Sequence, residues 1–259
     1  MTTTPIIDEA RCLTDWNRDG FFIVRGLFDS GTAASLIDAA VAIARTRPEL
    51  EPLPHVYIPE GRVRESATNP EEGLAKVFRL HRTAPFDAIA RDDCVLDLVG
   101  AILGPDLDAF LSQFIWKWPE AYGQPWHQDS FYFPFEPDQQ IGVWVAANRA
   151  TITNGCLWVV PGSHTEPVHT HVADDRPNAT QAYTKIVDHD MSAAVPVEME
   201  PGDVLFFDSH LMHSSTDNES NELRAALVTH YALAGTEVLN ELANTVTDWM
   251  PVRRQGAAV

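Results

Sequence analysis

The chain has 259 residues, of which 45% are hydrophobic and 21% charged, so it is long and apolar enough to form a buried core rather than remain disordered. Its formal net charge at pH 7, with histidine counted as neutral, is −19. Such a charge repels polyanions, which excludes nucleic acid and anionic membrane surfaces as expected partners.

The cysteine content and the first residues bear on the compartment. Cys12, Cys94 and Cys156 are few, odd in number and far apart, so they predict neither a disulfide framework nor a cysteine-ligated zinc site. The N-terminal residues lack the basic and apolar segments of a secretory signal, and no apolar run is long enough to cross a bilayer. We therefore expect a cytoplasmic protein with no membrane partner.

The first hundred or so residues predict a helix-rich part. A short β-like run occupies Phe21–Val24. Ser30 is expected to cap a helix over Gly31–Arg45, where apolar side chains recur with helical spacing. Residues 51–72 mix proline, glycine and charge without a period and predict a loop. A second helix is expected over Asp93–Leu103.

From Ala109 onward the pattern changes to short strands separated by turns such as Asn-Gly at 154–155. Many short strands at this spacing predict a sandwich or barrel. The polar, histidine-rich stretch at about 165–196 is too long for a tight turn, so it is a candidate lid or substrate loop. Residues 253–259 are expected to be frayed. The predicted strands are Phe110–Trp118, Ile141–Ala146, Cys156–Val160, Val204–Phe207 and Ala225–Ala232.

The strongest chemical signal is a set of four residues in the strand-rich part. On an extended chain the side chains of His127 and Asp129 point to the same side, although such a pair alone is common on surfaces. His213 follows an apolar strand and completes two imidazoles and one carboxylate, the facial triad associated with non-haem Fe(II) oxygenases. Eleven residues later, Arg224 offers a planar two-donor fork for a carboxylate. The set predicts a metal and an acidic co-substrate.

Three stretches occur in order around these residues: KWPEAYGQPWHQD, GVWVAANRATITNGCLWVVPGSH and EMEPGDVLFFDSHLMHSSTDNESNELRAAL. With them, from about Phe114 to Ala232, the chain resembles the phytanoyl-CoA dioxygenase family of iron- and 2-oxoglutarate-dependent oxygenases. The opening DGFFIVRGLF at Asp19–Phe28 matches more weakly. The resemblance implies a mainly β fold with flanking helices, a double-stranded β-helix (jelly roll, cupin-like). We expect one domain over 1–259, helix-rich to about 105, with the β-helix core at about 106–235.

The resemblance also implies roles for individual residues. His127, Asp129 and His213 would bind Fe(II). Arg224 and Ser215 would bind the distal carboxylate of 2-oxoglutarate. The other expected cofactor contacts are Trp144, beside the co-substrate, and the polar side chains of Gln124 and Lys117.

The reaction implied by the resemblance consumes O2 and 2-oxoglutarate, releases succinate and CO2, and hydroxylates a C–H bond of a small metabolite. Asp129 favours oxygen transfer, because related halogenases replace this carboxylate with a small residue. Desaturation, epimerisation and cyclisation stay open as outcomes. A non-catalytic cupin-like module that binds a metal or another ligand is an alternative, as is a zinc hydrolase, but neither gives Arg224 a role.

Several other residues have both a structural and a functional interpretation. The aromatic run Phe131–Phe135 is expected to pack mainly in the core, with Tyr132 and Phe133 as candidate substrate contacts. His230 is expected to be a hydrogen-bonded core residue and His210 a polar rim residue. Solvent exposure is expected for the loop histidines His169, His171 and His189, and for a mixed-charge surface that contains Arg62, Arg64, Lys76, Arg79 and Arg82.

Overall fold

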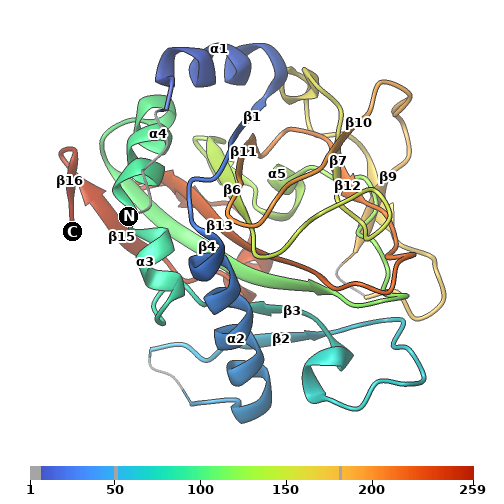
Figure 1. Ribbon diagram of the computed structural model, residues 1–259. Helices are drawn as coiled ribbons and strands as arrows, with labels where there is room; N and C mark the ends of the chain where they lie inside the picture. The colour runs from blue at the N-terminus through green and yellow to red at the C-terminus, as the bar shows by residue number, and fades with distance from the viewer. Residues whose placement is uncertain (1–6, 50–51, 181–182) are drawn as a thin grey trace.

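The computed structural model describes residues 7–49, 52–180 and 183–259. A large antiparallel sheet has helices on one face and a small sheet on the other (Figure 1). Among the described residues, none of the helices is long and apolar enough to span a membrane. The helices are α1 (Glu9–Asp19), α2 (Ser30–Thr46), α3 (Phe86–Ala90), α4 (Asp93–Leu103) and α5 (Asp129–Tyr132), with 3-10 turns η1 (Pro70–Gly73), η2 (Ser163–Thr165) and η3 (Glu241–Thr245).

The large sheet is organised around the long strand β13 (Arg224–Leu233), which lies between β6 (Gln140–Ala146) and β4 (Leu107–Lys117). All these pairings are antiparallel, which brings segments more than a hundred residues apart into one layer. The sheet continues beyond β6 through β11 (Val204–Asp208) and β1 (Phe21–Val24), and beyond β4 through β3 (Leu74–Phe78), β2 (Val56–Pro59), β15 (Met250–Arg254) and β16 (Ala257–Ala258).

The small sheet places β7 (Leu157–Val159) between its two other strands, β10 and β12. Two further strand pairs lie outside both sheets, and one of them is the hairpin formed by β8 and β9. The strands not yet given are β10 (Val195–Val197), β12 (His213–Ser215), β8 (His171–Ala173), β9 (Thr184–Ile186), β5 (Phe135–Glu136) and β14 (Glu237–Val238).

Both faces of the large sheet are covered, and the side chains of its strands alternate between two cores. Val143 and Phe206 pack with the helices α2 and α4 in one core. Trp144 and Phe207, each one residue further along, pack with the small sheet in the other. Alternate side chains of a strand point to opposite faces, so a strand that is covered on both faces has apolar residues at consecutive positions of its sequence. The apolar runs that predicted strands at β6 and β11 are therefore explained by burial on both faces, and the expectation of a mainly β fold with flanking helices is confirmed.

The predicted elements of the chain are mostly confirmed, with shifts at their ends. Each of the five predicted strands overlaps an observed one, and α4 has the predicted bounds. The cap of α2 was predicted wrongly: Asp29 is the N-cap, and its carboxylate accepts a hydrogen bond of 2.7 Å from the backbone of Thr32. Ser30 is already the first helical residue.

Two segments expected to be irregular contain structure. Residues 51–72 include β2, which pairs with β3, and the turn η1. The C-terminal residues are not frayed, because β15 pairs with β4 and Arg253 donates hydrogen bonds to the backbone of Leu96 and the carboxylate of Asp97. The helix α1 was not predicted. The C-terminal strands gain stability from a partner distant in the sequence, β4, which a local pattern does not reveal.

Candidate active site

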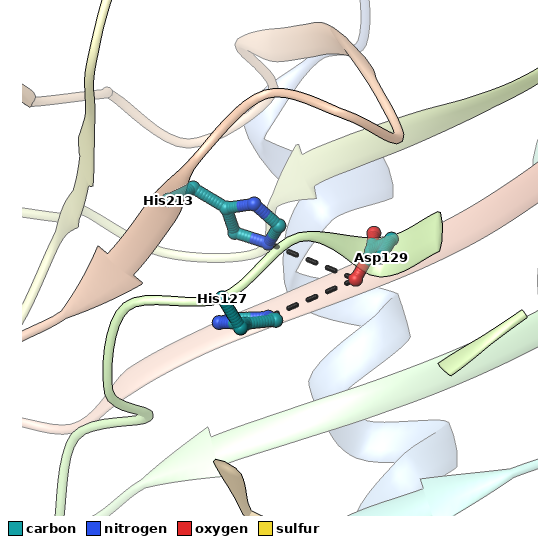
Figure 2. Close-up of side chains that lie close together, drawn as sticks. All are labelled: His127, Asp129 and His213. Atoms are coloured by element: carbon teal, nitrogen blue, oxygen red, sulfur yellow. Dashed lines mark ion pairs between the residues drawn. The ribbon is translucent and has the colours of Figure 1, made fainter. Parts of the chain in front are cut away.

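Two histidines and one aspartate converge beside the small sheet (Figure 2). His127 forms an isolated bridge with His213, the first residue of β12, through backbone hydrogen bonds of 2.9 and 3.0 Å. Asp129 begins α5, so the chain is extended only as far as Gln128. Its Oδ1 lies 3.7 Å from Nε2 of His127 and 3.9 Å from Nε2 of His213. All three side chains are buried, which makes them a compact metal-ligand set.

The orientation of both imidazoles is fixed by contacts of their Nδ1 atoms with backbone carbonyl oxygens. Nδ1 of His127 lies 2.7 Å from the carbonyl oxygen of Pro125, and Nδ1 of His213 lies 2.9 Å from that of Leu211. When each Nδ1–H donates to its carbonyl, each Nε2 keeps a lone pair directed toward Asp129, as metal-binding histidines require. Burial, together with the proximity of His213, lowers the pKa of His127 well below its usual value, which favours the neutral ligand form.

Gln128, between the two ligand residues, anchors their segment and was missed in the sequence. Its side chain is fully buried and does not line the cavity beside the triad. Its Oε1 accepts a hydrogen bond of 2.8 Å from the backbone of His169, and its Nε2 donates one of 2.9 Å to the carbonyl of His210. The alternation that aligns His127 with Asp129 places Gln128 on the opposite side, so the extended pattern itself was the available signal.

A cavity of about 550 Å³ opens beside the triad, and Arg224 reaches into it from the first position of β13. The guanidinium is buried. Its Nε donates to the carbonyl of Gly155 at 3.0 Å, and it lies over the ring of Trp144 at 5.8 Å. Nη1 is buried without a hydrogen-bond partner among the described residues. Burial lowers the pKa of Arg224 to about 10, yet the group stays charged at neutral pH, so its Nη1 is a charged donor available to a ligand in the cavity.

Gly155 holds the carbonyl that positions Arg224, and its backbone requires glycine. Its φ is +84°, and a Cβ there would lie 2.5 Å from Cδ of Lys117 and 2.6 Å from the carbonyl oxygen of Thr216. Gly155→Ala is expected to lower the free energy of unfolding by about 1–3 kcal/mol, measured by urea denaturation.

A matched control separates backbone strain from close approach in this experiment. Gly235 has a φ of +83°, but nothing lies within 4 Å of a Cβ placed there. Gly235→Ala therefore introduces backbone strain without a close contact, and it should lower the free energy of unfolding less than Gly155→Ala does. Equal losses in the two variants would contradict the close contact.

A second cation of the cavity was expected on the surface. Lys76 of β3 is buried, and its Nζ donates to Oε1 of Gln124 at 2.7 Å and lies 5.1 Å from the centre of the Tyr183 ring. Burial lowers the pKa of Lys76 to about 8, against the attraction of Asp129. The predicted solvated position was wrong because the register of β3 on β4 turns Lys76 inward beside Ile115.

His230 also differs from its prediction. It is buried and lines the cavity, but neither ring nitrogen has a hydrogen-bond partner among the described residues, so it is not a satisfied core histidine. Nδ1 lies 3.7 Å from Oδ2 of Asp129. Burial lowers the pKa of His230 to about 4, so the ring is neutral at pH 7. Oε1 of Gln113, on the neighbouring strand, is likewise buried and unpaired within the described chain.

The other predicted site residues lie at the cavity with one exception. Ser215 accepts a hydrogen bond of 3.1 Å from the backbone of Gln124, whose Nε2 lies 2.9 Å from Nε2 of His127. Lys117 is the exception: it lies beside Arg224 across the β4–β13 pairing, but its Nζ donates to the carbonyl of Thr216 and it does not line the cavity. The lining includes Trp144, Ser215, Gln124, Tyr132, Phe133 and also Phe131.

Comparison with known families and proteins agrees with this geometry. The family model described as phytanoyl-CoA dioxygenase (PhyH) matches residues 16–226. A probable phytanoyl-CoA dioxygenase of Caenorhabditis elegans is 39% identical over 147 residues, which is 54% of this chain and 47% of the relative. The human peroxisomal phytanoyl-CoA dioxygenase is 27% identical over 230 residues, 85% and 67% of the two chains. The chain spans about half the length of the worm and bovine relatives.

Solved structures share the fold over nearly the whole chain. The epimerase SnoN, in complex with Fe3+, alpha ketoglutarate and nogalamycin RO, has a TM-score of 0.70 at 21% identity, covering 97% of this chain and 95% of SnoN. EvdO2 from Micromonospora carbonacea var. aurantiaca, complexed with 2-oxoglutarate, has a TM-score of 0.65 at 23% identity, covering 96% and 100%. The predicted jelly-roll fold is thereby confirmed.

Proposed function

The chain belongs to the phytanoyl-CoA dioxygenase family, and on that premise we propose that it is an Fe(II)- and 2-oxoglutarate-dependent dioxygenase. It hydroxylates a C–H bond of a small metabolite and releases succinate and CO2. One observation carries the proposal: the convergent ligand set and the unpaired Nη1 of Arg224 face the same cavity. A non-catalytic metal-binding module, or a zinc hydrolase, would leave that buried charge without a ligand.

The residues of the triad fit a ferrous ion. His127, Asp129 and His213 supply two imidazole nitrogens and one carboxylate. Both Nδ1 atoms lie at backbone carbonyls, and the side-chain amide of Gln124 lies 2.9 Å from Nε2 of His127, where a metal ion would displace it. These three residues would hold the ion and would leave room at it for the co-substrate and O2. When bound, the metal supplies the O2 activation that is coupled to decarboxylation of 2-oxoglutarate. The protein binds and orients the reactants and restricts the access of water.

The two buried cations place the co-substrate. Arg224 has an unpaired donor for the distal carboxylate of 2-oxoglutarate, Trp144 lies beside its guanidinium, and Ser215 lines the same cavity. Lys76 lies on the same side of the sheet and adds a second positive charge. Short-range pairing in a region of low dielectric constant offsets the repulsion of a dianion by a protein of net charge −19.

The rest of the cavity suits a compact, mostly apolar substrate. Its lining includes Ile58, Phe78 and Phe133, while the unpaired Oε1 of Gln113 offers an acceptor to a substrate hydroxyl or amide. We do not expect a CoA thioester, although relatives carry that name. Its phosphates need unpaired cations, and the arginines that flank Tyr122 are already paired with carboxylates. These pairs are Arg62–Asp217, Arg176–Asp217 and Arg176–Asp174.

An anaerobic titration tests the proposed function. Adding Fe(II) and then 2-oxoglutarate is expected to produce a weak visible charge-transfer band, because the co-substrate would bind the metal through its keto and carboxylate oxygens. Succinate, which lacks the keto group, is the control and should give no band. If 2-oxoglutarate also gives none while iron is bound, the co-substrate assignment is wrong.

The cysteines bear on the proposed compartment. Cys12, Cys94 and Cys156 are all free. Free thiols are typical of a reducing environment, and we therefore propose a cytoplasmic location. Detection of the tagged protein in a cytosolic fraction tests this.

A further inference from the structure

A second cluster of possible metal ligands lies outside the cavity, at the base of the β8–β9 hairpin. Glu166 and His169 precede β8, and His189 follows β9 (β9 is labelled in Figure 1). Oε2 of Glu166 lies 2.9 Å from Nε2 of His169 and 3.4 Å from Nε2 of His189. One donor atom from each of the three residues lies within 4.8 Å of the others. The side chains are partly buried, so the expectation that these histidines are simply solvated was wrong.

The histidine at the centre of this cluster is oriented as metal ligands usually are. Nδ1 of His169 lies 3.2 Å from Oδ1 of Asp188, and Oδ2 of the same aspartate accepts a hydrogen bond of 3.1 Å from the backbone of Thr170. A carboxylate that holds the far nitrogen of an imidazole fixes its tautomer and raises its basicity as a ligand. When Nδ1–H donates to Asp188, Nε2 of His169 carries a lone pair that faces Oε2 of Glu166 at 2.9 Å, and a cation bound by both atoms would relieve their repulsion.

We propose that Glu166, His169 and His189 bind a zinc ion. Two imidazoles and one carboxylate suit zinc, whereas Ca²⁺ and Mg²⁺ prefer ligand sets made of oxygen alone. Three protein ligands leave the fourth tetrahedral position to water. The alternative is a metal-free ion-pair cluster, in which a doubly protonated His169 bridges Glu166 and Asp188.

The position of this site gives the ion a role in ordering the active site. Its ligands lie on both sides of the hairpin, so one ion clamps the two strands where they begin and end. Beyond this base the hairpin carries Tyr183, which lines the cavity, and Thr184, whose hydroxyl bonds that of Tyr132 at 2.8 Å. The backbone of His169 also holds Gln128, between the two ligand residues His127 and Asp129. A zinc ion here would thus order both the hairpin that supplies Tyr183 to the cavity and the segment that carries His127 and Asp129.

Zinc stoichiometry tests the proposal, with zinc sulfate as the probe and metal content measured after gel filtration. Because the triad also accepts zinc, the wild-type chain is expected to bind two ions and His189→Ala one. In the double variant His127→Ala/His213→Ala, one ion should remain. Adding His189→Ala or His169→Ala to that variant should weaken its binding at least tenfold.

A matched histidine and a second readout make the outcome decisive. His210 is as exposed as His189 and lies 2.8 Å from Asp138. It contacts the cluster only at the backbone carbonyl of Glu166, 3.2 Å from its Nδ1, and supplies no ligand atom, so His210→Ala should leave both ions bound. Zinc should raise the melting temperature of the double variant, and this increase should vanish with His189→Ala. Equal stoichiometry in the wild type and His189→Ala, or no zinc bound to the folded double variant, would overturn the proposal in favour of the metal-free ion-pair cluster.

Discussion

Replacing His127 or Asp129 with alanine is expected to lower 2-oxoglutarate-dependent succinate release at least about 100-fold. Each change removes one of the three groups that hold the metal, and losing even the outer partners of metal ligands typically costs 10- to 100-fold. The assay supplies saturating Fe(II), O2 and 2-oxoglutarate, so that weaker binding of one of them is not mistaken for a lower catalytic rate.

The control for this prediction is His210→Ala. His210 lies three residues before His213, but it pairs with Asp138 outside the cavity. This variant should keep most of the activity, with a circular dichroism spectrum like that of the wild type. Undiminished turnover in both His127→Ala and Asp129→Ala would show that the metal is held elsewhere.

Arg224→Lys is expected to raise the 2-oxoglutarate concentration needed for half-maximal succinate release by about 10- to 100-fold. The change replaces a planar fork, fixed by Gly155 and Trp144, with a single ammonium group. A charge-assisted hydrogen bond contributes about 1.5–3 kcal/mol, which corresponds to that range. The maximal rate should fall much less, since the metal ligands are unchanged.

Arg253→Lys serves as the matched control for Arg224→Lys. Arg253 is also a buried arginine on a strand of the large sheet, but it contacts the backbone of Leu96 and the carboxylate of Asp97, outside the cavity. Its replacement should lower stability without changing the 2-oxoglutarate requirement. A requirement that stays unchanged in Arg224→Lys would place the co-substrate carboxylate at another residue.

The electrostatics of the cavity explain why so acidic a protein can bind a dianion. The net charge of −19 acts over long range and is screened by salt, whereas Arg224 and Lys76 act over a few ångströms in a buried space. Burial without carboxylate partners is costly for both cations, as the lowered pKa values of about 10 and about 8 indicate. Pairing with an anionic ligand offsets part of this desolvation free energy. The two buried cations therefore favour binding of the co-substrate.

Much of the candidate site could be predicted because its signals are local or repeated in known relatives. The two-residue spacing of His127 and Asp129 was enough to place them on one side, and an apolar strand ending at a turn preceded His213. That His213 meets them depends on its bridge to His127 across 86 positions, which the family resemblance supplied and the residues alone did not.

The remaining site residues depend on register between distant strands. Lys76 faces the cavity only because β3 pairs with β4 with Lys76 opposite Ile115. His230 lies six positions after Arg224 on β13, and this even spacing places both side chains on one face of the strand. Its lack of a hydrogen-bond partner was not predictable, because it reflects which side chains of other strands fill the surrounding space. The β8–β9 hairpin was missed because its pairing joins segments within a stretch that has no strand pattern of its own.

The most direct test of the central claim is a crystal structure of the chain grown without oxygen in the presence of Fe(II) and 2-oxoglutarate. We predict one iron bound by Nε2 of His127, Nε2 of His213 and the carboxylate of Asp129, with the distal carboxylate of 2-oxoglutarate on the guanidinium of Arg224. Iron or 2-oxoglutarate bound outside this cavity, with those four side chains turned away from both, would contradict it.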